Sequence, residues 1–366
     1  MPLTVDLMSP VFGRFIDAVG IGGRTLPQLE PSPGDVCAAA DLCLHMSRFF
    51  KSEGLRGEAL LGVLRAYFAP FEVSDHAEYA VFSNPTLHGR SGEGCGDGEQ
   101  RRRLTLKVAL KNELADSYFQ GQRFFQDHLE KEQSDLLRAG DVCPALLMQI
   151  SGPSLRICAL ASETDLPNKR RQPRITCKPL MPTLDLLYNP RRPEALLAVA
   201  RTLAATKAAL GELDAHYCSR PAAIASAALR QIPYPLRAPP FSGAARLLSN
   251  RQLFHAVHEV WGPVAVKFWC AAPYGEDVHR LWADEGLAPK LHDVVMLPGS
   301  IRMLVMEQLG LSDGWAPLCN ALPGLADAAS ARRAVREALR AALASRWPGR
   351  PACKPVHGDM RPGDRG

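Results

Sequence analysis

Residues 262–270 read GPVAVKFWC, and this stretch decides the fold of the C-terminal half of the chain. Its apolar residues alternate as they do in a strand with one buried side, yet Lys267 stands among them. Burying an ammonium group costs several kcal/mol unless a partner offsets that cost. We therefore expect Lys267 to meet a carboxylate or a phosphate, and the helix predicted next offers Glu276 and Glu285.

The segments around this strand follow in a definite order. A weaker strand should precede it, and a helix, a strand and an Arg/Ala-rich helix should follow, over 247–257, 274–285, 301–309 and 328–347 respectively. The last residues read PVHGDMRPGDRG, 355–366. No single phrase here is specific, so the order of the phrases carries the inference.

This order resembles that of protein kinases. The phrase IRMLVMEQL (301–309) resembles their hinge strand, which implies that Met306 lies near the gatekeeper position and that Glu307 begins the adenine-binding hinge. The phrase PVHGDMRP resembles their catalytic loop. The resemblance implies that Asp359 accepts the proton of a substrate hydroxyl, and that His357 belongs to the same site.

Residues 231–366 resemble, more closely, the kinase-like domains of basidiomycete fungi. The connected phrases are PYPLRAPPF, VAVKF, YGEDVHRLWADEGLAPKLHDV, IRMLVMEQL and VHGDMRP. The resemblance implies an α+β small lobe that binds ATP and Mg²⁺, with Lys267 and Glu276 at the phosphates. The substrate would be a protein or a small molecule with a hydroxyl group.

The chain departs from the kinase pattern in three ways. Asp364 replaces an asparagine that would bind Mg²⁺, and aspartate is also a ligand that this ion accepts. The segment 247–261 lacks the glycines of a phosphate-covering loop. The sequence ends before a DFG aspartate, an activation segment and the large lobe. We therefore expect negligible phosphate transfer by the 366-residue chain, which would make it a truncated pseudokinase.

The N-terminal half shows a different pattern. Residues 1–34 are rich in proline and glycine and are expected to be irregular. Two helices, a strand at 103–111, another helix, a pair of strands around Gly152-Pro153 and a long helix at 194–217 should follow. This order predicts an α/β domain over 35–218, and a Pro-rich linker (219–243) separates it from residues 244–366.

This α/β domain resembles restriction-endonuclease-like, PD-(D/E)XK nucleases, whose metal-binding acid and lysine lie two residues apart on one strand. The resemblance rests on ALKNE (109–113), the strand pair and the long helix. It places Lys111 and Glu113 in the site, but Ala109 stands where the acid belongs. Glu113, on the same strand face as Lys111, is the candidate replacement for that acid, with Asp75 or Asp97 as the earlier carboxylate, so we expect a degenerate nuclease.

The composition says little more about the partners, the metal sites or the localisation of the protein. A net charge of +5 is too small to indicate a nucleic-acid partner, so that partner stays a weak alternative. The ten cysteines form no CxxC pair, and His255 and His258, which could share a helical face, lack a third ligand. No signal peptide and no run of about 18 apolar residues is visible, which favours an intracellular protein of the cytoplasm or nucleus that does not bind a membrane.

Three functional classes therefore remain open. The first is a kinase-like ATP-dependent phosphotransferase, the second a metal-dependent nuclease, and the third a pseudoenzyme that binds a protein partner as a scaffold or effector.

Overall fold

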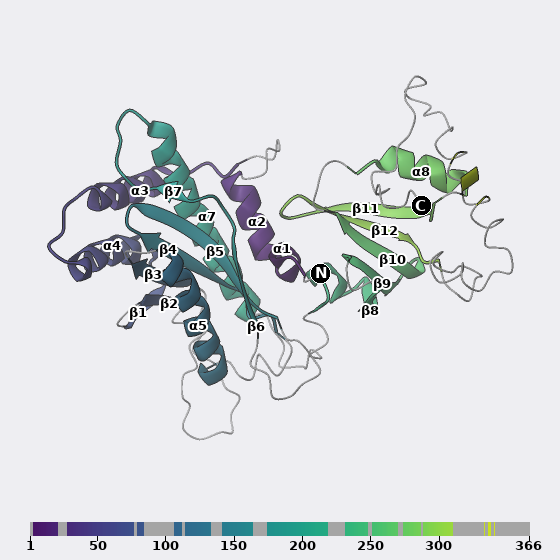
Figure 1. The fold of residues 1–366 in the computed structure, drawn as a ribbon, viewed down its shortest axis with the longest axis horizontal. Coiled ribbons are helices and arrows are strands. Elements are labelled where there is room, and N and C mark those ends of the chain that lie inside the picture. Colours follow the sequence, from purple (N-terminus) through teal and green to yellow (C-terminus); the bar gives the residue numbers. More distant parts are fainter. Residues whose placement is uncertain are drawn as a thin grey trace. The chain divides into compact units, whose positions relative to one another are not determined.

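The computed structural model divides into two compact units (Figure 1). The N-terminal unit comprises residues 2–235 together with 298–300, and the C-terminal unit comprises 236–297 and 301–366. The boundary at 235/236 falls within the segment predicted as a linker. The structure describes residues 3–20, 28–76, 79–83, 106–111, 114–132, 141–163, 174–218, 231–247, 251–269, 274–286, 288–309, 333, 336, 337 and 340.

The N-terminal unit is built on a seven-stranded mixed sheet in the order β1-β2-β3-β4-β5-β6, with β7 paired to β5. Strands β3 and β4 are parallel, and all the other pairs are antiparallel. The strands are β1 (Glu72–His76), β2 (Tyr79–Ser83), β3 (Leu106–Lys111), β4 (Ala145–Ser151), β5 (Ser154–Glu163), β6 (Arg174–Pro179) and β7 (Leu184–Asp185).

Strand β4 lies at the centre of this unit. All seven of its residues are buried, so both faces of the sheet are covered there. Helix α5 (Leu114–Glu132) connects β3 to β4, because parallel neighbours need a long crossover. Its residues Phe125 and Leu129 pack with Leu147, Leu160 and Tyr217 in one apolar cluster.

The remaining helices of the unit pack around α7 (Pro193–Cys218), as Figure 1 shows. Helices α2 and α3 contact α7 directly, and α4 packs against α3. Their bounds are Val5–Met8 for α1, Pro10–Val19 for α2, Pro33–Met46 for α3 and Glu53–Phe68 for α4.

Residues 3–20 were predicted to be irregular, and that prediction is wrong. Pro10 is the first residue of α2, where a missing N–H costs nothing. Gly20 ends α2 in the left-handed conformation (φ 76°). The proline and glycine that suggested an irregular chain therefore mark the two ends of a helix.

The C-terminal unit is built on a five-stranded antiparallel sheet in the order β11-β12-β10-β9-β8. Three consecutive strands lead into helix α8, which is followed by two more strands. The short 3-10 turn Tyr234–Leu236 spans the boundary between the units. The elements of the C-terminal unit are β8 (Phe241–Arg246), β9 (Leu253–His258), β10 (Gly262–Trp269), α8 (Glu276–Asp284), β11 (Leu291–Leu297) and β12 (Ile301–Glu307). The fold is thus mixed α/β with largely antiparallel sheets.

Three details of this unit differ from the expectations. The strand predicted over 247–257 overlaps β9, which begins at Leu253, while β8 and β11 were not predicted. His255 and His258 lie on strand β9, where an odd spacing points them to opposite faces rather than to one helical face. The helix predicted over 328–347 falls almost wholly outside the described residues.

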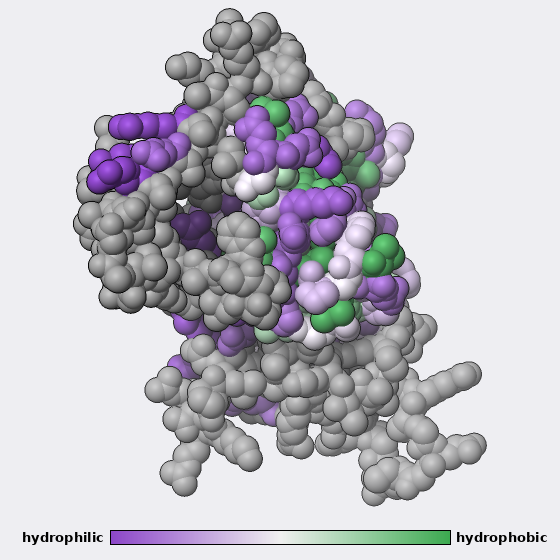
Figure 2. Space-filling view, turned by 90° about the vertical axis from the view of Figure 1, so that its right-hand side faces the viewer, coloured by the Kyte–Doolittle hydropathy of each residue, from purple (hydrophilic) through white to green (hydrophobic). Residues whose placement is uncertain are grey.

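The surface turned to the viewer in Figure 2 mixes hydrophilic and hydrophobic residues among the coloured atoms. Exposed apolar side chains of this unit, such as Val260 and Met296, are normal for a soluble surface when they are scattered. In the described part of the chain, no helix combines the length and the hydropathy that crossing a bilayer requires.

Candidate functional site

The residues singled out from the sequence fall into two groups. His357, Asp359 and Asp364 lie outside the described residues, and so do Glu113 and Asp97. The structure describes the other group in two separate places. Lys267, Glu276, Met306 and Glu307 belong to the C-terminal unit, and Lys111 ends strand β3 of the N-terminal unit.

Lys267 occupies the middle of β10, opposite Leu253 of β9 and Leu304 of β12. Ala265, Lys267 and Trp269 share one face of the strand, because side chains alternate, and Val264, Val266 and Phe268 are buried on the other. The Lys267 side chain is half-buried. The strand thus directs an ammonium group onto the same face as an apolar cluster that includes Leu291, Leu304 and Met306.

Two aromatic rings surround the ammonium group of Lys267. Its Nζ lies 5.0 Å from the ring centroid of Trp269 and 5.8 Å from that of Tyr274. The two rings meet edge to face, with centroids 6.0 Å apart and planes at 65°. Both distances are within the range of cation–π attraction.

Tyr274 is held by the buried ring of His279 in α8. Nε2 of His279 donates to the Pro289 carbonyl (2.8 Å), so its neutral ring accepts the Tyr274 hydroxyl proton at Nδ1. Desolvation lowers the pKa of His279, and the charges of Lys267 and Arg280 lower it further, against the opposing hydrogen bond to Pro289. The geometry and the charges therefore both favour a neutral imidazole.

Glu276 is the first residue of α8, and its ion pair is with Arg280, one turn along the helix (3.4 Å). Arg280 also donates to the carbonyl of Leu291 (3.5 Å). Glu285 is exposed at the C-terminal end of α8. Glu276 was expected to approach Lys267, but in this structure it pairs with a residue of its own helix.

On the sheet face that carries Lys267, the neighbouring residues of β10 and β12 are apolar. Ala265 pairs with Met306 of β12 on one side and with His255 of β9 on the other. Nδ1 of His255 donates to Oε1 of Gln308 (3.3 Å). The backbone N–H of Glu307 donates to the Lys290 carbonyl (2.8 Å), and the backbone N–H of Lys290 donates to the Glu307 carboxylate (3.2 Å).

The register of the N-terminal sheet places Lys111 opposite Ser151 and Ala109 opposite Gln149. Gln149 is fully buried, and its Oε1 accepts the S–H of Cys158 (3.3 Å). Around Ala109, β4 therefore supplies a neutral amide rather than a carboxylate. Among the residues that the structure describes, no group of three or more His, Cys, Asp and Glu is placed to hold a metal ion.

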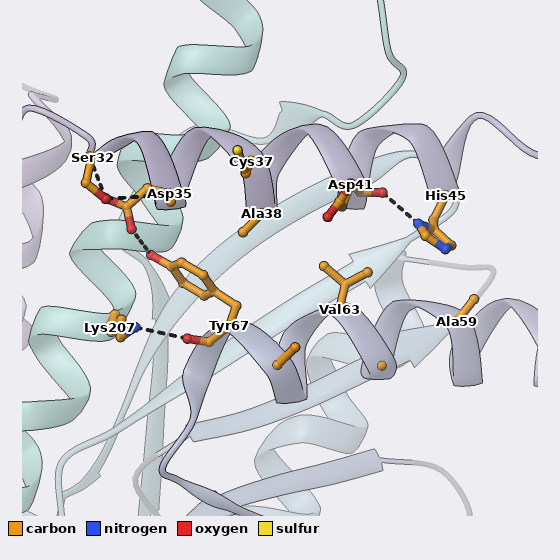
Figure 3. Close-up of a pocket in the computed structure, with 13 residues that line it drawn as sticks. Ser32, Asp35, Cys37, Ala38, Asp41, His45, Ala59, Val63, Tyr67 and Lys207 are labelled. Atoms are coloured by element: carbon orange, nitrogen blue, oxygen red, sulfur yellow. Dashed lines mark hydrogen bonds between the residues drawn. The ribbon is translucent and has the colours of Figure 1, made fainter.

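A groove that the sequence did not suggest runs between α3 and α4, with a volume of about 700 Å³ (Figure 3). Small side chains of both helices, such as Ala38 and Ala59, line it together with Asp41 and His45. Glycine and alanine at helical spacing on both helices were the available sequence signal, but such residues are as common in ordinary helix packing.

Hydrogen bonds between helices close one end of this groove. Asp35 accepts the hydroxyl of Tyr67 and forms a capping box with Ser32, while Lys207 of α7 donates to the Tyr67 carbonyl (3.1 Å), as Figure 3 shows. Desolvation acts to raise the pKa of Asp35, but the hydrogen bonds from Tyr67 and Ser32 outweigh it and lower that pKa. These polar groups join α3, α4 and α7, so they stabilise the fold.

Comparison of the chain with family models, with curated proteins and with solved structures returned no match. The functional argument therefore rests on the geometry of the two units.

Proposed function

We propose that the C-terminal unit is a protein-kinase-like module that binds ATP with Mg²⁺, and that Lys267 pairs the phosphates. The observation that carries this proposal is the place of Lys267 in the sheet. In protein kinases the phosphate-pairing lysine ends a V-A-I-K phrase on the third strand, and the next helix carries its glutamate partner. Here VAVK (264–267) lies on the third strand of the sheet, and α8 follows it.

The surface near Lys267 supports the same proposal. Ala265 lies two residues from Lys267 on the same face, and Met306 lies next to Ala265. Ligand sites are mostly apolar with a few polar groups that fix orientation. Adenine would contact Ala265 and Met306, and the hinge at 307–309 would supply backbone hydrogen bonds, as the resemblance to protein kinases implies.

We propose further that the chain binds the nucleotide but transfers phosphate poorly, as a pseudokinase does. Kinase catalysis needs the ion pair between the strand lysine and the helix glutamate. Glu276 is paired with Arg280, which supports an inactive arrangement in which the ion pair between Lys267 and Glu276 is not formed. The roles of Asp359, His357 and Asp364 rest on the resemblance alone, as does the hydroxyl-bearing substrate.

Thermal shift with ATP and Mg²⁺ tests the binding. A ligand present at about 100 times its Kd stabilises the protein that binds it by about 2.7 kcal/mol. We expect a shift for the natural chain and for Lys290→Ala, which removes an exposed lysine of the same unit. The shift should vanish in Lys267→Ala. An equal shift in all three proteins would reject the role of Lys267.

A metal-dependent nuclease is the second candidate. The central place of β3, parallel to β4 after a helical crossover, favours a nuclease-like scaffold around Lys111. The neutral residues at Ala109 and Gln149 argue against metal binding there. We therefore expect no nicking of supercoiled plasmid with Mn²⁺. Nicking that disappears in Lys111→Ala would make the nuclease the better proposal.

A further inference from the structure

The rings of Trp269 and Tyr274 form a corner that faces the Lys267 ammonium group. Trp269 leaves the same strand two residues after Lys267, so the two side chains stand side by side on one face. Tyr274 comes from the residues just before α8. Strand β10 and the segment before α8 thus each place one aromatic ring against the ammonium group of Lys267. We call Trp269 and Tyr274 the aromatic seat of Lys267.

Hydrogen bonds and apolar packing hold the two rings of the aromatic seat in place. The Tyr274 hydroxyl donates to His279, whose other nitrogen donates to Pro289, and Arg302 of β12 donates to the Tyr274 carbonyl (3.3 Å). Both rings also pack on the apolar cluster of Leu291, Leu304 and Met306. Linked hydrogen bonds polarise one another, so a phenol that donates to His279 presents a more electron-rich ring to the cation. The rings are therefore held in place, and the lysine is the long, flexible partner.

We propose that the aromatic seat holds Lys267 in the nucleotide-free chain, and that ATP must draw the ammonium group off the rings to pair it with phosphate. This inference rests on the proposed function, since it concerns how the same site is regulated. Apparent affinity falls in proportion to the fraction of protein in the competent state. The seat therefore weakens nucleotide binding, and a change that removes a ring should strengthen it.

Calorimetric titration of the 366-residue chain with ATP and Mg²⁺ measures this competition. Trp269→Leu removes one face of the seat, whereas Trp269→Phe keeps an aromatic ring at the same position. We expect Trp269→Leu to bind about fivefold more tightly than the natural chain, and Trp269→Phe to bind within about twofold of it. Unchanged or weaker binding of ATP by Trp269→Leu would show that the aromatic seat does not compete with ATP for Lys267. If the natural chain still bound ATP in that case, the proposed function would stand.

A second measurement needs no nucleotide. A lysine-selective acylating reagent must approach the amine closely, and the Trp269 and Tyr274 rings that flank Nζ of Lys267 restrict that approach. We expect acylation of Lys267, mapped by mass spectrometry, to be faster in Trp269→Leu than in the natural chain or Trp269→Phe, with exposed Lys290 as the internal reference. If the natural chain binds no ATP but this rate difference is found, the proposed function and the competition with ATP both fail, and only the holding of Lys267 by the two rings stands. Equal rates at Lys267 in the three proteins would overturn the seat.

Discussion

The ring of His279 is buried in the C-terminal unit and hydrogen-bonded at both nitrogens, as donor to Pro289 and acceptor from Tyr274. Its pKa lies below the ordinary 6.5, chiefly through desolvation. The unfolded chain therefore binds a proton more readily than the folded chain as the pH falls. The stability that this neutral ring provides is complete above pH 6.5 and is lost as the pH falls through the lowered pKa of the folded state.

We predict that the free energy of unfolding falls less between pH 7 and pH 5 in His279→Gln than in the natural chain. Glutamine can still accept from Tyr274 and donate to Pro289, but it does not titrate. Urea unfolding at several pH values, followed by tryptophan fluorescence, measures the difference. His292 also has a lowered pKa, mainly through desolvation and then through Lys290, so His279→Gln should retain some pH dependence. Identical pH profiles would contradict the prediction.

At the scale of elements, α5 and β4 approach closely because of one glycine. A Cβ at Gly121 of α5 would lie 2.5 Å from Cδ2 of Leu147, a fully buried side chain of β4. A Cβ at Gly211 of α7 would meet nothing within 4 Å. The two glycines are both helical, so they differ mainly in the space around them.

We predict opposite effects of alanine at these two positions. Gly211→Ala should stabilise the protein by up to about 1 kcal/mol through helix propensity. Gly121→Ala gains the same propensity but overpacks Leu147, which costs about 1–3 kcal/mol, so we expect no gain or a net loss. Chemical denaturation followed by circular dichroism compares the two variants. A gain at Gly121 equal to that at Gly211 would show that α5 can move away from β4.

The elements also show what the sequence could predict. The long helix predicted at 194–217 is α7, because Leu203, Leu210 and Leu213 repeat with a helical period and are all buried. Two of the strands that were not predicted contain irregularities. Strand β8 shifts register between Ser242 and Ala245, and β11 shifts between Leu291 and Asp293. A bulge interrupts the alternation of period two on which strand prediction depends.

Some contacts of the candidate site could also be predicted from the sequence, and others could not. Ala265, Lys267 and Trp269 share a face of β10, and a period of two makes that visible from the sequence. Tyr274 reaches Lys267 from the segment before α8, and no periodicity reports such a contact. The pairing of Glu276 with Arg280 was open to prediction, because an acid four residues before a base on one helix is a common local pair, although Lys267 was the partner expected. Contacts between elements depend on tertiary packing, which local patterns do not contain.

At the scale of the whole molecule, the two units differ in a property that makes them separately observable. All five tryptophans of the chain lie between residues 261 and 347, within the C-terminal unit. Tryptophan fluorescence therefore reports on the C-terminal unit alone, whereas far-ultraviolet circular dichroism reports on the helices and strands of both. A chain of two units need not unfold in a single step.

We predict that urea unfolding of the natural chain gives different midpoints by these two signals. ATP with Mg²⁺ should move the fluorescence transition and only that part of the dichroism transition that comes from the C-terminal unit. A ligand stabilises the state that binds it, so the shift should be confined to the unit that contains Lys267. Lys267→Ala should retain the two transitions and lose the shift, which separates loss of binding from loss of folding. Coincident transitions that ATP moves together would mean that the units unfold as one cooperative body, and that nucleotide binding in the C-terminal unit also stabilises the mixed sheet of the N-terminal unit.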